Sequence, residues 1–214
     1  MWATVVAVAV AAGISIWAAP DLPARVPMHF DLSGRPDRLG SRTEALVGIP
    51  LLVFGLGVLF WVLPLVDPRQ GNIARSAKAY RACMLAILAF LVGVHGLIIL
   101  NGVGRPVPVV RAINGGAGLL FVVIGNYLGK TRSNWFFGVR TPWTLSSERS
   151  WGKTNRLAGR GFAMLGILVI VAALLGSPVA MLAVIFGGLT LLAVALAAYS
   201  YREWRLDEVT GKRA

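Results

Sequence analysis

The sequence has few charged side chains, a single cysteine and only two histidines, and each shortage excludes a class of protein. Charged residues make up 14% of the 214 positions, against roughly 25% in an average soluble domain, while 57% are hydrophobic. So few charges could not cover the surface of a soluble protein of this size. Cys83 alone forms neither an intramolecular disulfide nor a cysteine metal cluster. The composition therefore excludes a disulfide scaffold and favours a membrane protein.

The hydrophobic residues are gathered in blocks whose length suits a lipid bilayer. The first block covers about 27 Å as a helix, close to the thickness of the hydrocarbon core. No positive charge precedes it, so we expect a retained helix, with a cleaved signal peptide as the alternative. The sequence thus predicts an all-α, polytopic membrane protein, a bundle of six transmembrane helices. The six predicted helices cover residues 2–19, 45–66, 82–100, 109–128, 157–175 and 179–198.

Four regions follow from these blocks. Residues 1–44 hold the first transmembrane helix and an outward-facing, Pro-rich loop, and residues 45–128 hold helices 2 to 4. Residues 129–160 form an aromatic and basic cytoplasmic loop, and residues 161–214 hold helices 5 and 6 with a short tail. Six spans would place 15 of the 21 Lys and Arg residues on the side of both termini and 6 on the other. The positive-inside rule therefore predicts that both termini are cytoplasmic.

The net charge of +12 suggests which partners to expect. In a soluble chain it would indicate nucleic acid, but here the cations lie beside apolar spans. Anionic membrane lipids are therefore the expected partner, and no direct contact with nucleic acid is expected.

The cytoplasmic loop mixes aromatic rings with cations at high density. Ser146 is the expected helix N-cap, and a helix from there would carry Arg149, Lys153, Arg156 and Arg160 on one face. We expect Trp151 to anchor this helix at headgroup depth. Two interpretations stay open: a solvated loop that only sets topology, and a site that binds phosphate or a partner.

Two intramembrane features predict packing contacts. Gly125 and Gly129 form a GxxxG pattern, which lets helices approach closely. His95 is the ionisable residue of the third span, and we expect a neutral imidazole hydrogen-bonded to a neighbouring helix. No carboxylate lies within a predicted span, so proton-coupled pumping lacks its usual relay.

The outward loop contains the other candidate site. His29 and Asp31 point the same way in an extended segment, and Asp37 could add a third group to a metal or substrate site. The alternative, which we favour, is a solvent-facing His29 and a turn held by the Asp31 side chain. Ser41 is the expected cap of the second helix. With no catalytic motif in the chain, we expect neither an enzyme, a metal nor a cofactor.

Residues 129–159 closely resemble the signature of the SdpI family of integral membrane immunity and signal-transduction proteins, and residues 26–42 resemble a domain of unknown function that often precedes it. The resemblance implies protection of a bacterial cell membrane against a secreted toxic peptide, and capture of a cytoplasmic repressor when the toxin is bound. Many relatives have histidine where this chain has Asn155, so a proton-transfer or metal-binding role that the histidine would serve in the family is not expected of this chain. The residues implied are Asn134, Phe137, Gly138, Arg140, Thr141, Pro142, Trp143, Thr144, Trp151, Lys153 and Thr154.

The leading functional hypothesis is therefore antimicrobial peptide resistance, with signal transduction through the inner surface. The peptide would be met near His29, Asp31 and Asp37 or within the bundle, and Arg140 and Trp143 are the expected transmitting contacts. A lipid-phosphate-binding or transporting protein is the alternative. A membrane enzyme built on the His29 loop is a third hypothesis.

Overall fold

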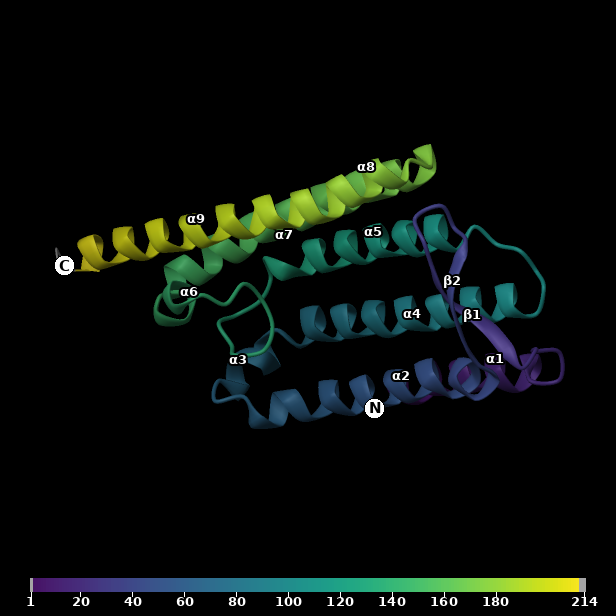
Figure 1. Ribbon diagram of the computed structural model, residues 1–214. Coiled ribbons are helices and arrows are strands. Elements are labelled where there is room, and N and C mark those ends of the chain that lie inside the picture. Colours follow the sequence, from purple (N-terminus) through teal and green to yellow (C-terminus); the bar gives the residue numbers. More distant parts are fainter. Residues whose placement is uncertain (1, 212–214) are drawn as a thin grey trace.

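Long helices form most of the computed structural model, which describes residues 2–211 (Figure 1). Five helices are long and apolar enough to cross a membrane: α2 (Arg42–Val66), α4 (Ala77–Gly102), α5 (Val109–Leu128), α7 (Glu148–Leu175) and the run from Pro178 to Gly211. That run comprises α8 (Pro178–Leu182), a π-helical turn η1 (Ala183–Gly187) and α9 (Gly188–Gly211). A sixth apolar helix, α1 (Trp2–Ala18), is shorter. The predicted helical character is confirmed.

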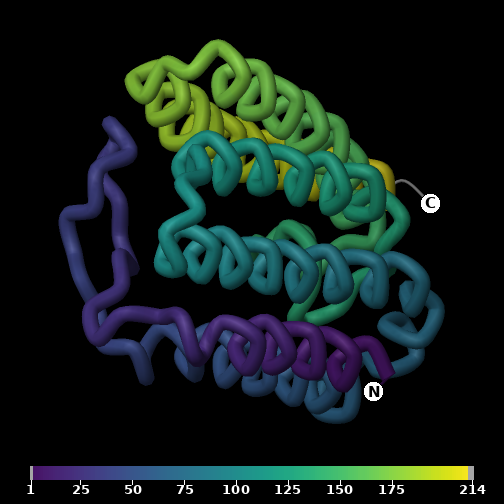
Figure 2. The backbone as a smooth tube through the Cα atoms, turned by 90° about the vertical axis from the view of Figure 1, so that its right-hand side faces the viewer, coloured from purple at the N-terminus to yellow at the C-terminus, as the bar shows by residue number. Residues whose placement is uncertain are grey.

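The helices are stacked in layers that follow the order of the chain. α1 and α2 pack together at one side, α4 lies next to them, α5 follows, and α7 with α9 completes the other side (Figure 1). The tube view shows the same order and places both ends of the described chain toward one end of the bundle (Figure 2). The α5–α7 pair makes the most extensive contact between any two elements of residues 2–211.

A β-hairpin at the opposite end makes the all-α prediction incomplete. Strand β1 (Arg25–Phe30) pairs antiparallel with β2 (Pro36–Ser41), with Val26 opposite Gly40. The buried Val26 packs with Ala18, Ala45 and Ile99, so the hairpin closes the end of the α1–α2–α4 layer. Ser41 caps α2 as predicted, its hydroxyl accepting the Glu44 N–H at 3.1 Å.

Several helix boundaries differ from the sequence prediction. A short helix α3 (Gln70–Arg75) interrupts the second loop, and α4 begins five residues before the expected position 82. The basic segment belongs to α7 itself, which begins at Glu148 and is capped by Ser147, so the predicted Ser146 cap was wrong by one residue. The expected tail is also helical, because α9 runs through to Gly211.

Glycines explain why α5 and α7 approach so closely. A Cβ added to Gly125 would lie 2.6 Å from the Gly159 carbonyl oxygen, and one added to Gly118 would lie 2.7 Å from the Gly166 carbonyl oxygen. A Cβ at Gly129 would lie 3.1 Å from the Cα of Arg156. The close packing predicted from the Gly125–Gly129 pattern is confirmed.

His95 connects three helices inside the α1–α2–α4 layer. It is fully buried, and its Nε2 lies 3.0 Å from the hydroxyl of Ser15 on α1. The same hydroxyl donates to the Leu46 carbonyl of α2 at 2.7 Å. The predicted hydrogen bond from His95 to a neighbouring helix is therefore present.

Candidate functional site

The segment between α5 and α7 is folded around the side chain of Asn134, which is fully buried. Its Nδ2 donates to the carbonyls of Arg132 and Phe137, both at 2.9 Å. Its Oδ1 accepts the N–H groups of Phe136 at 2.9 Å and Phe137 at 2.7 Å. The amide thus uses both of its donors and both acceptor positions within one tight loop. Asn134, predicted as a binding residue, holds the backbone that would present such a site.

Asp67 and Arg69, which sequence reasoning missed, attach this loop to the end of α2. The Asp67 carboxylate is 1% exposed and accepts the N–H of Arg69 at 2.6 Å and that of Trp135 at 2.9 Å. The Arg69 guanidinium donates to the Ser133 hydroxyl and, at 2.7 Å, to the Leu145 carbonyl. The available signal was Asp67 itself, an acid among the cations of its loop that directly follows an apolar block.

Trp151 lies inside the protein, so the expectation that it anchors α7 at headgroup depth was wrong. The residue is 1% exposed, and its indole N–H donates to the Thr131 carbonyl at 3.0 Å. One turn later, Asn155 accepts the Val139 N–H at 2.8 Å and donates to the Trp151 carbonyl at 3.1 Å. Gly138 lies between them with φ +125, where a Cβ would come within 3.0 Å of both side chains. Asn155 therefore acts as a structural bridge.

The short helix α6 (Pro142–Ser146) follows in the same loop; it contains Trp143, and Arg140 directly precedes its cap. Thr141 caps it and forms a reciprocal capping box with Thr144, and Pro142 occupies its first turn. The Trp143 ring packs edge-on against Tyr201 of α9, with centroids 5.2 Å apart. The exposed Arg140 donates to the Trp135 carbonyl at 2.5 Å. The two predicted transmitting residues thus differ: Trp143 contacts α9, and Arg140 contacts the backbone of its own loop.

The C-terminal part of α9 is bonded to the start of α7 by a buried carboxylate. Glu203 is 3% exposed, and its Oε2 lies 3.2 Å from both Arg149 Nε and Lys153 Nζ. Nearby, the Ser147 hydroxyl donates to Asp207 at 2.5 Å, and the Ser150 hydroxyl donates to the Ser200 carbonyl at 2.8 Å. Sequence reasoning missed Glu203, although the spacing of Ser200, Glu203 and Asp207 places them on one helical face.

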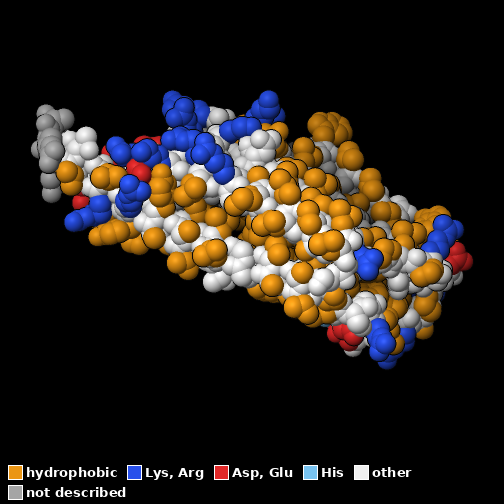
Figure 3. Space-filling model, turned by 90° about the horizontal axis from the view of Figure 1, so that it is seen from above, with side chains coloured by type: hydrophobic (Ala, Val, Ile, Leu, Met, Phe, Trp, Pro, Cys, Tyr) orange, Lys and Arg blue, Asp and Glu red, His pale blue; other side chains and the backbone are white. Residues whose placement is uncertain are grey.

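The other cations of the predicted basic face surround a groove between α5 and α7. Two adjoining hollows of about 450 and 530 Å³ share Gly129, Lys130 and Arg156 in their walls. We call these two hollows the basic groove. Lys130, Arg132, Arg156 and Arg160 on its walls are exposed, and within residues 2–211 none has a carboxylate within 4 Å. Figure 3 shows Lys and Arg side chains gathered at the end of the molecule that carries this groove.

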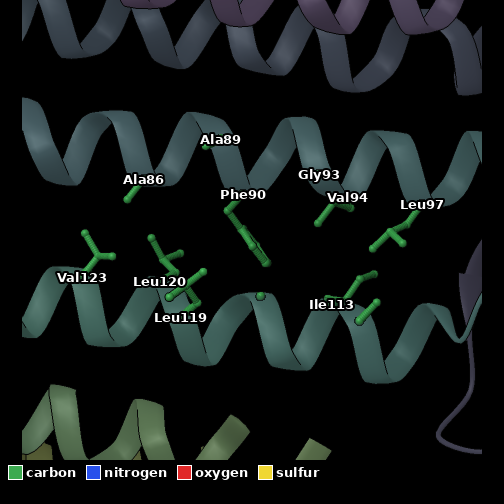
Figure 4. Close-up of a pocket in the computed structure, with 12 residues that line it drawn as sticks. Ala86, Ala89, Phe90, Gly93, Val94, Leu97, Ile113, Leu119, Leu120 and Val123 are labelled. Atoms are coloured by element: carbon green, nitrogen blue, oxygen red, sulfur yellow. The ribbon is translucent and has the colours of Figure 1, made fainter.

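An apolar crevice lies between α4 and α5. It encloses about 320 Å³ and is lined only by hydrophobic residues and glycines, including Phe90, Leu97 and Gly116. Figure 4 shows Phe90 and Leu97 of α4 and Leu120 of α5 pointing into the space between the two helices. The small residues Gly93 and Gly116 contribute to its depth, and no charged group lines it.

The hairpin brings together only part of the predicted outward site. His29 Nδ1 lies 2.6 Å from Asp37 Oδ1, and both side chains are largely exposed. Asp31 instead holds the turn, since its Oδ1 accepts from the N–H groups of Ser33 and Arg35, both at 2.9 Å. The favoured interpretation of Asp31 as a turn residue is confirmed. In residues 2–211 no group of three or more His, Cys, Asp or Glu side chains could hold a metal ion.

Comparison with known proteins extends this description. Residues 130–200 match the SdpI/YfhL protein family, and residues 6–54 match a domain of unknown function, DUF1648. The chain is 25% identical over 181 residues to a protein named immunity protein SdpI from Bacillus subtilis (strain 168), an alignment that covers 84% of each chain. No solved structure shows significant similarity to it. The family match includes the Asn134 loop, all of α7, and the run from α8 to Ser200 of α9.

Proposed function

We propose that the chain is a membrane immunity protein that gives resistance to a secreted antimicrobial peptide, because its residues 130–200 match the SdpI/YfhL family. The observation that carries this proposal is the similarity to an immunity protein across 84% of both chains. The geometry is compatible with it, because hydrogen bonds hold the Asn134 loop against the end of α2 and the beginning of α7. At 25% identity, the relative supports the family-level function.

The proposal includes a topology of six spans in the bacterial cell membrane, with both termini cytoplasmic. Supporting this, α1, α2, α4, α5, α7 and the run from α8 to α9 follow the bundle in alternating directions and return the chain to the end where it started (Figure 2). The cation-rich loops and the basic groove lie at that end, as the positive-inside rule requires of the cytoplasmic side. The hairpin with His29 and Asp37 then faces outward.

The apolar crevice between α4 and α5 is the proposed place of contact with the peptide. A membrane-active peptide carries an apolar surface, and small residues such as Gly93 and Gly116 let another helix approach closely. The hairpin lies at the outer end of the same layer, packed against α4, where an arriving peptide would first meet the protein. This site would take the peptide laterally from the outer half of the bilayer.

Signal transduction to a cytoplasmic repressor is the second part of the proposal. Peptide binding between α4 and α5 would change signalling only if it favoured one helix arrangement over another. α5 leads directly into the Asn134 loop, and Trp143 in α6 contacts Tyr201 of α9. A shift of α5 would therefore be transmitted to Arg140 and Trp143 on the inner surface.

The test is heterologous protection. The chain is expressed in a peptide-sensitive bacterium and exposed to killing peptides from its source organism and relatives, with survival as the readout. We expect protection that Arg140→Ala and Trp143→Ala reduce at least about tenfold, while Arg75→Ala and Trp61→Ala, at exposed positions outside the loop, retain it. Equal membrane levels of all variants are the control. Absence of protection against every peptide tested would overturn the proposal.

A further inference from the structure

The basic groove contains uncompensated positive charge beside an apolar wall. Arg149 and Lys153 share the Glu203 carboxylate, but Lys130, Arg156 and Arg160 have no acidic partner within 4 Å among residues 2–211. Further along α5 and α7, the same groove is lined by Val122, Gly125, Gly159 and Ala163. A ligand that fills it must therefore present negative charge at one end and apolar surface at the other.

The position of these cations along the helices indicates the depth of the ligand. Arg160 is the last charged residue of α7, and the following stretch to Leu175 is apolar. Lys130 stands two residues past the end of α5, in which residues 119–125 are apolar and Asn126 is the polar residue of the last turn. Both helices thus change from apolar to basic at the groove, which is the arrangement expected at the level of lipid phosphates.

We propose that the basic groove binds an anionic phospholipid, with its phosphate between Lys130, Arg156 and Arg160 and an acyl chain along Val122 and Ala163. The close contact of Gly125 with Gly159 forms the floor on which that chain lies. Charge complementarity selects an anionic headgroup, because Glu148 is the one acidic residue that lines either hollow. This site does not depend on the proposed immunity function.

The experiment measures lipid binding to the full-length protein in detergent by native mass spectrometry. Phosphatidylglycerol is titrated against phosphatidylcholine with matched acyl chains, and soluble glycerol phosphate is added as a competitor. We expect the wild-type protein to bind phosphatidylglycerol at least about tenfold more tightly than phosphatidylcholine, and the K130Q/R156Q/R160Q variant to lose that preference. Glycerol phosphate at the same concentration should displace little of the lipid, because it lacks the chain that the apolar wall binds.

A charge-matched control separates this site from general attraction to anionic lipid. R75Q/R202Q/R205Q removes the same three charges from exposed positions outside the groove, and we expect it to bind phosphatidylglycerol as the wild type does. R156K keeps the charge and should retain most of the preference, which shows that the lipid requires the positive charge at this position and not the arginine itself. Equal weakening in both triple variants would overturn the proposal. So would full displacement by glycerol phosphate, which would indicate a site for a soluble phosphate, or anionic lipid binding that the groove variant leaves unchanged.

Discussion

The Nζ atom of Lys153 lies 3.2 Å from a carboxylate oxygen of Glu203, although 50 positions separate the two residues in the sequence. The Glu203 side chain is 4% exposed, and that of Lys153 is 40% exposed. Arg149 contacts the same oxygen from the previous turn of α7. The buried acid therefore neutralises part of a basic face and holds the last turns of α9 against the beginning of α7.

Removing this acid should loosen α9. Glu203→Gln leaves two cations without a counterion, and we expect a loss of about 1–2 kcal/mol of unfolding free energy, because the cations are partly solvated and recover some of the interaction with water. Thermal unfolding in detergent measures the change. Glu208→Gln, at an exposed position nearby, should leave the midpoint unchanged, and an equal shift in both variants would contradict the assignment.

The Asn134 side chain should stabilise the loop between α5 and α7. Asn134→Ala removes four hydrogen bonds and leaves the N–H groups of Phe136 and Phe137 without their acceptor. The expected cost is about 2–4 kcal/mol, since buried donors then lack partners. Limited proteolysis between α5 and α7 should show faster cleavage in this variant. Asn126→Ala, on the exposed face of α5, is the matched control and should be cleaved as slowly as the wild type.

The packing of α5 on α7 can be tested with a single methyl group. In Gly125→Ala the new Cβ would lie 2.5 Å from the Ala163 backbone nitrogen, so the helices must separate, at a cost of about 1–3 kcal/mol. Gly115→Ala introduces the same group on the same helix, where nothing lies within 4 Å. The midpoint of SDS unfolding should therefore fall for Gly125→Ala and stay unchanged for Gly115→Ala. A wild-type midpoint for Gly125→Ala would show that this contact adds little to stability.

Much of the fold follows from composition, but the interior of the candidate site does not. Apolar blocks of spanning length locate the long helices, because each must satisfy its backbone hydrogen bonds internally within a bilayer. The hairpin was not predicted, because among its strand residues only Val26 and Gly40 are buried and the alternation that marks a strand is missing. These strands are stabilised by the packing of Val26 against the helices and by the hydrogen bonds of the Asp31 turn.

Trp151 was wrongly placed and Glu203 was missed for the same physical reason. Trp151 has the amphipathic character of an interfacial residue, yet its indole N–H finds the Thr131 carbonyl inside the protein. Glu203 belongs to a segment rich in charge, and only its tertiary partners, Arg149 and Lys153, make its burial possible. Residue type gives the preference of a side chain, whereas the partner that satisfies it comes from helices distant in sequence.

The turn of the hairpin should respond to acid. Hydrogen bonds from the Ser33 hydroxyl and the Arg35 backbone N–H to Asp31 lower the pKa of that carboxyl below its ordinary value. Because the pKa is lower in the folded state, ionised Asp31 stabilises the turn at pH values above the unfolded-state pKa. This stabilisation is lost as the pH falls through the lower, folded-state pKa. Carboxyl chemical shifts of Asp31, followed by NMR from pH 6 downward, should show the depressed midpoint. Ser33→Ala should raise it, and an unchanged midpoint would rule out the hydroxyl as its main cause.

Membrane orientation is the prediction on which both proposals rest for their geometry. By sequence, the second and fourth loops and the C-terminal tail, which six spans assign to the side of both termini, contain 15 of the 21 Lys and Arg residues, so the end of the bundle that carries the basic groove should be cytoplasmic. In a Cys83→Ser background, a cysteine at Ser33 in the hairpin turn should react with an impermeant thiol reagent applied to intact cells. A cysteine at Ser146, at the end of α6, should react only after the cells are opened. Both positions are exposed in the structure, so a failure to react reports the membrane and not burial. Reaction of both from the same side would contradict the six-span arrangement, and the opposite pattern would place the basic groove outside the cell.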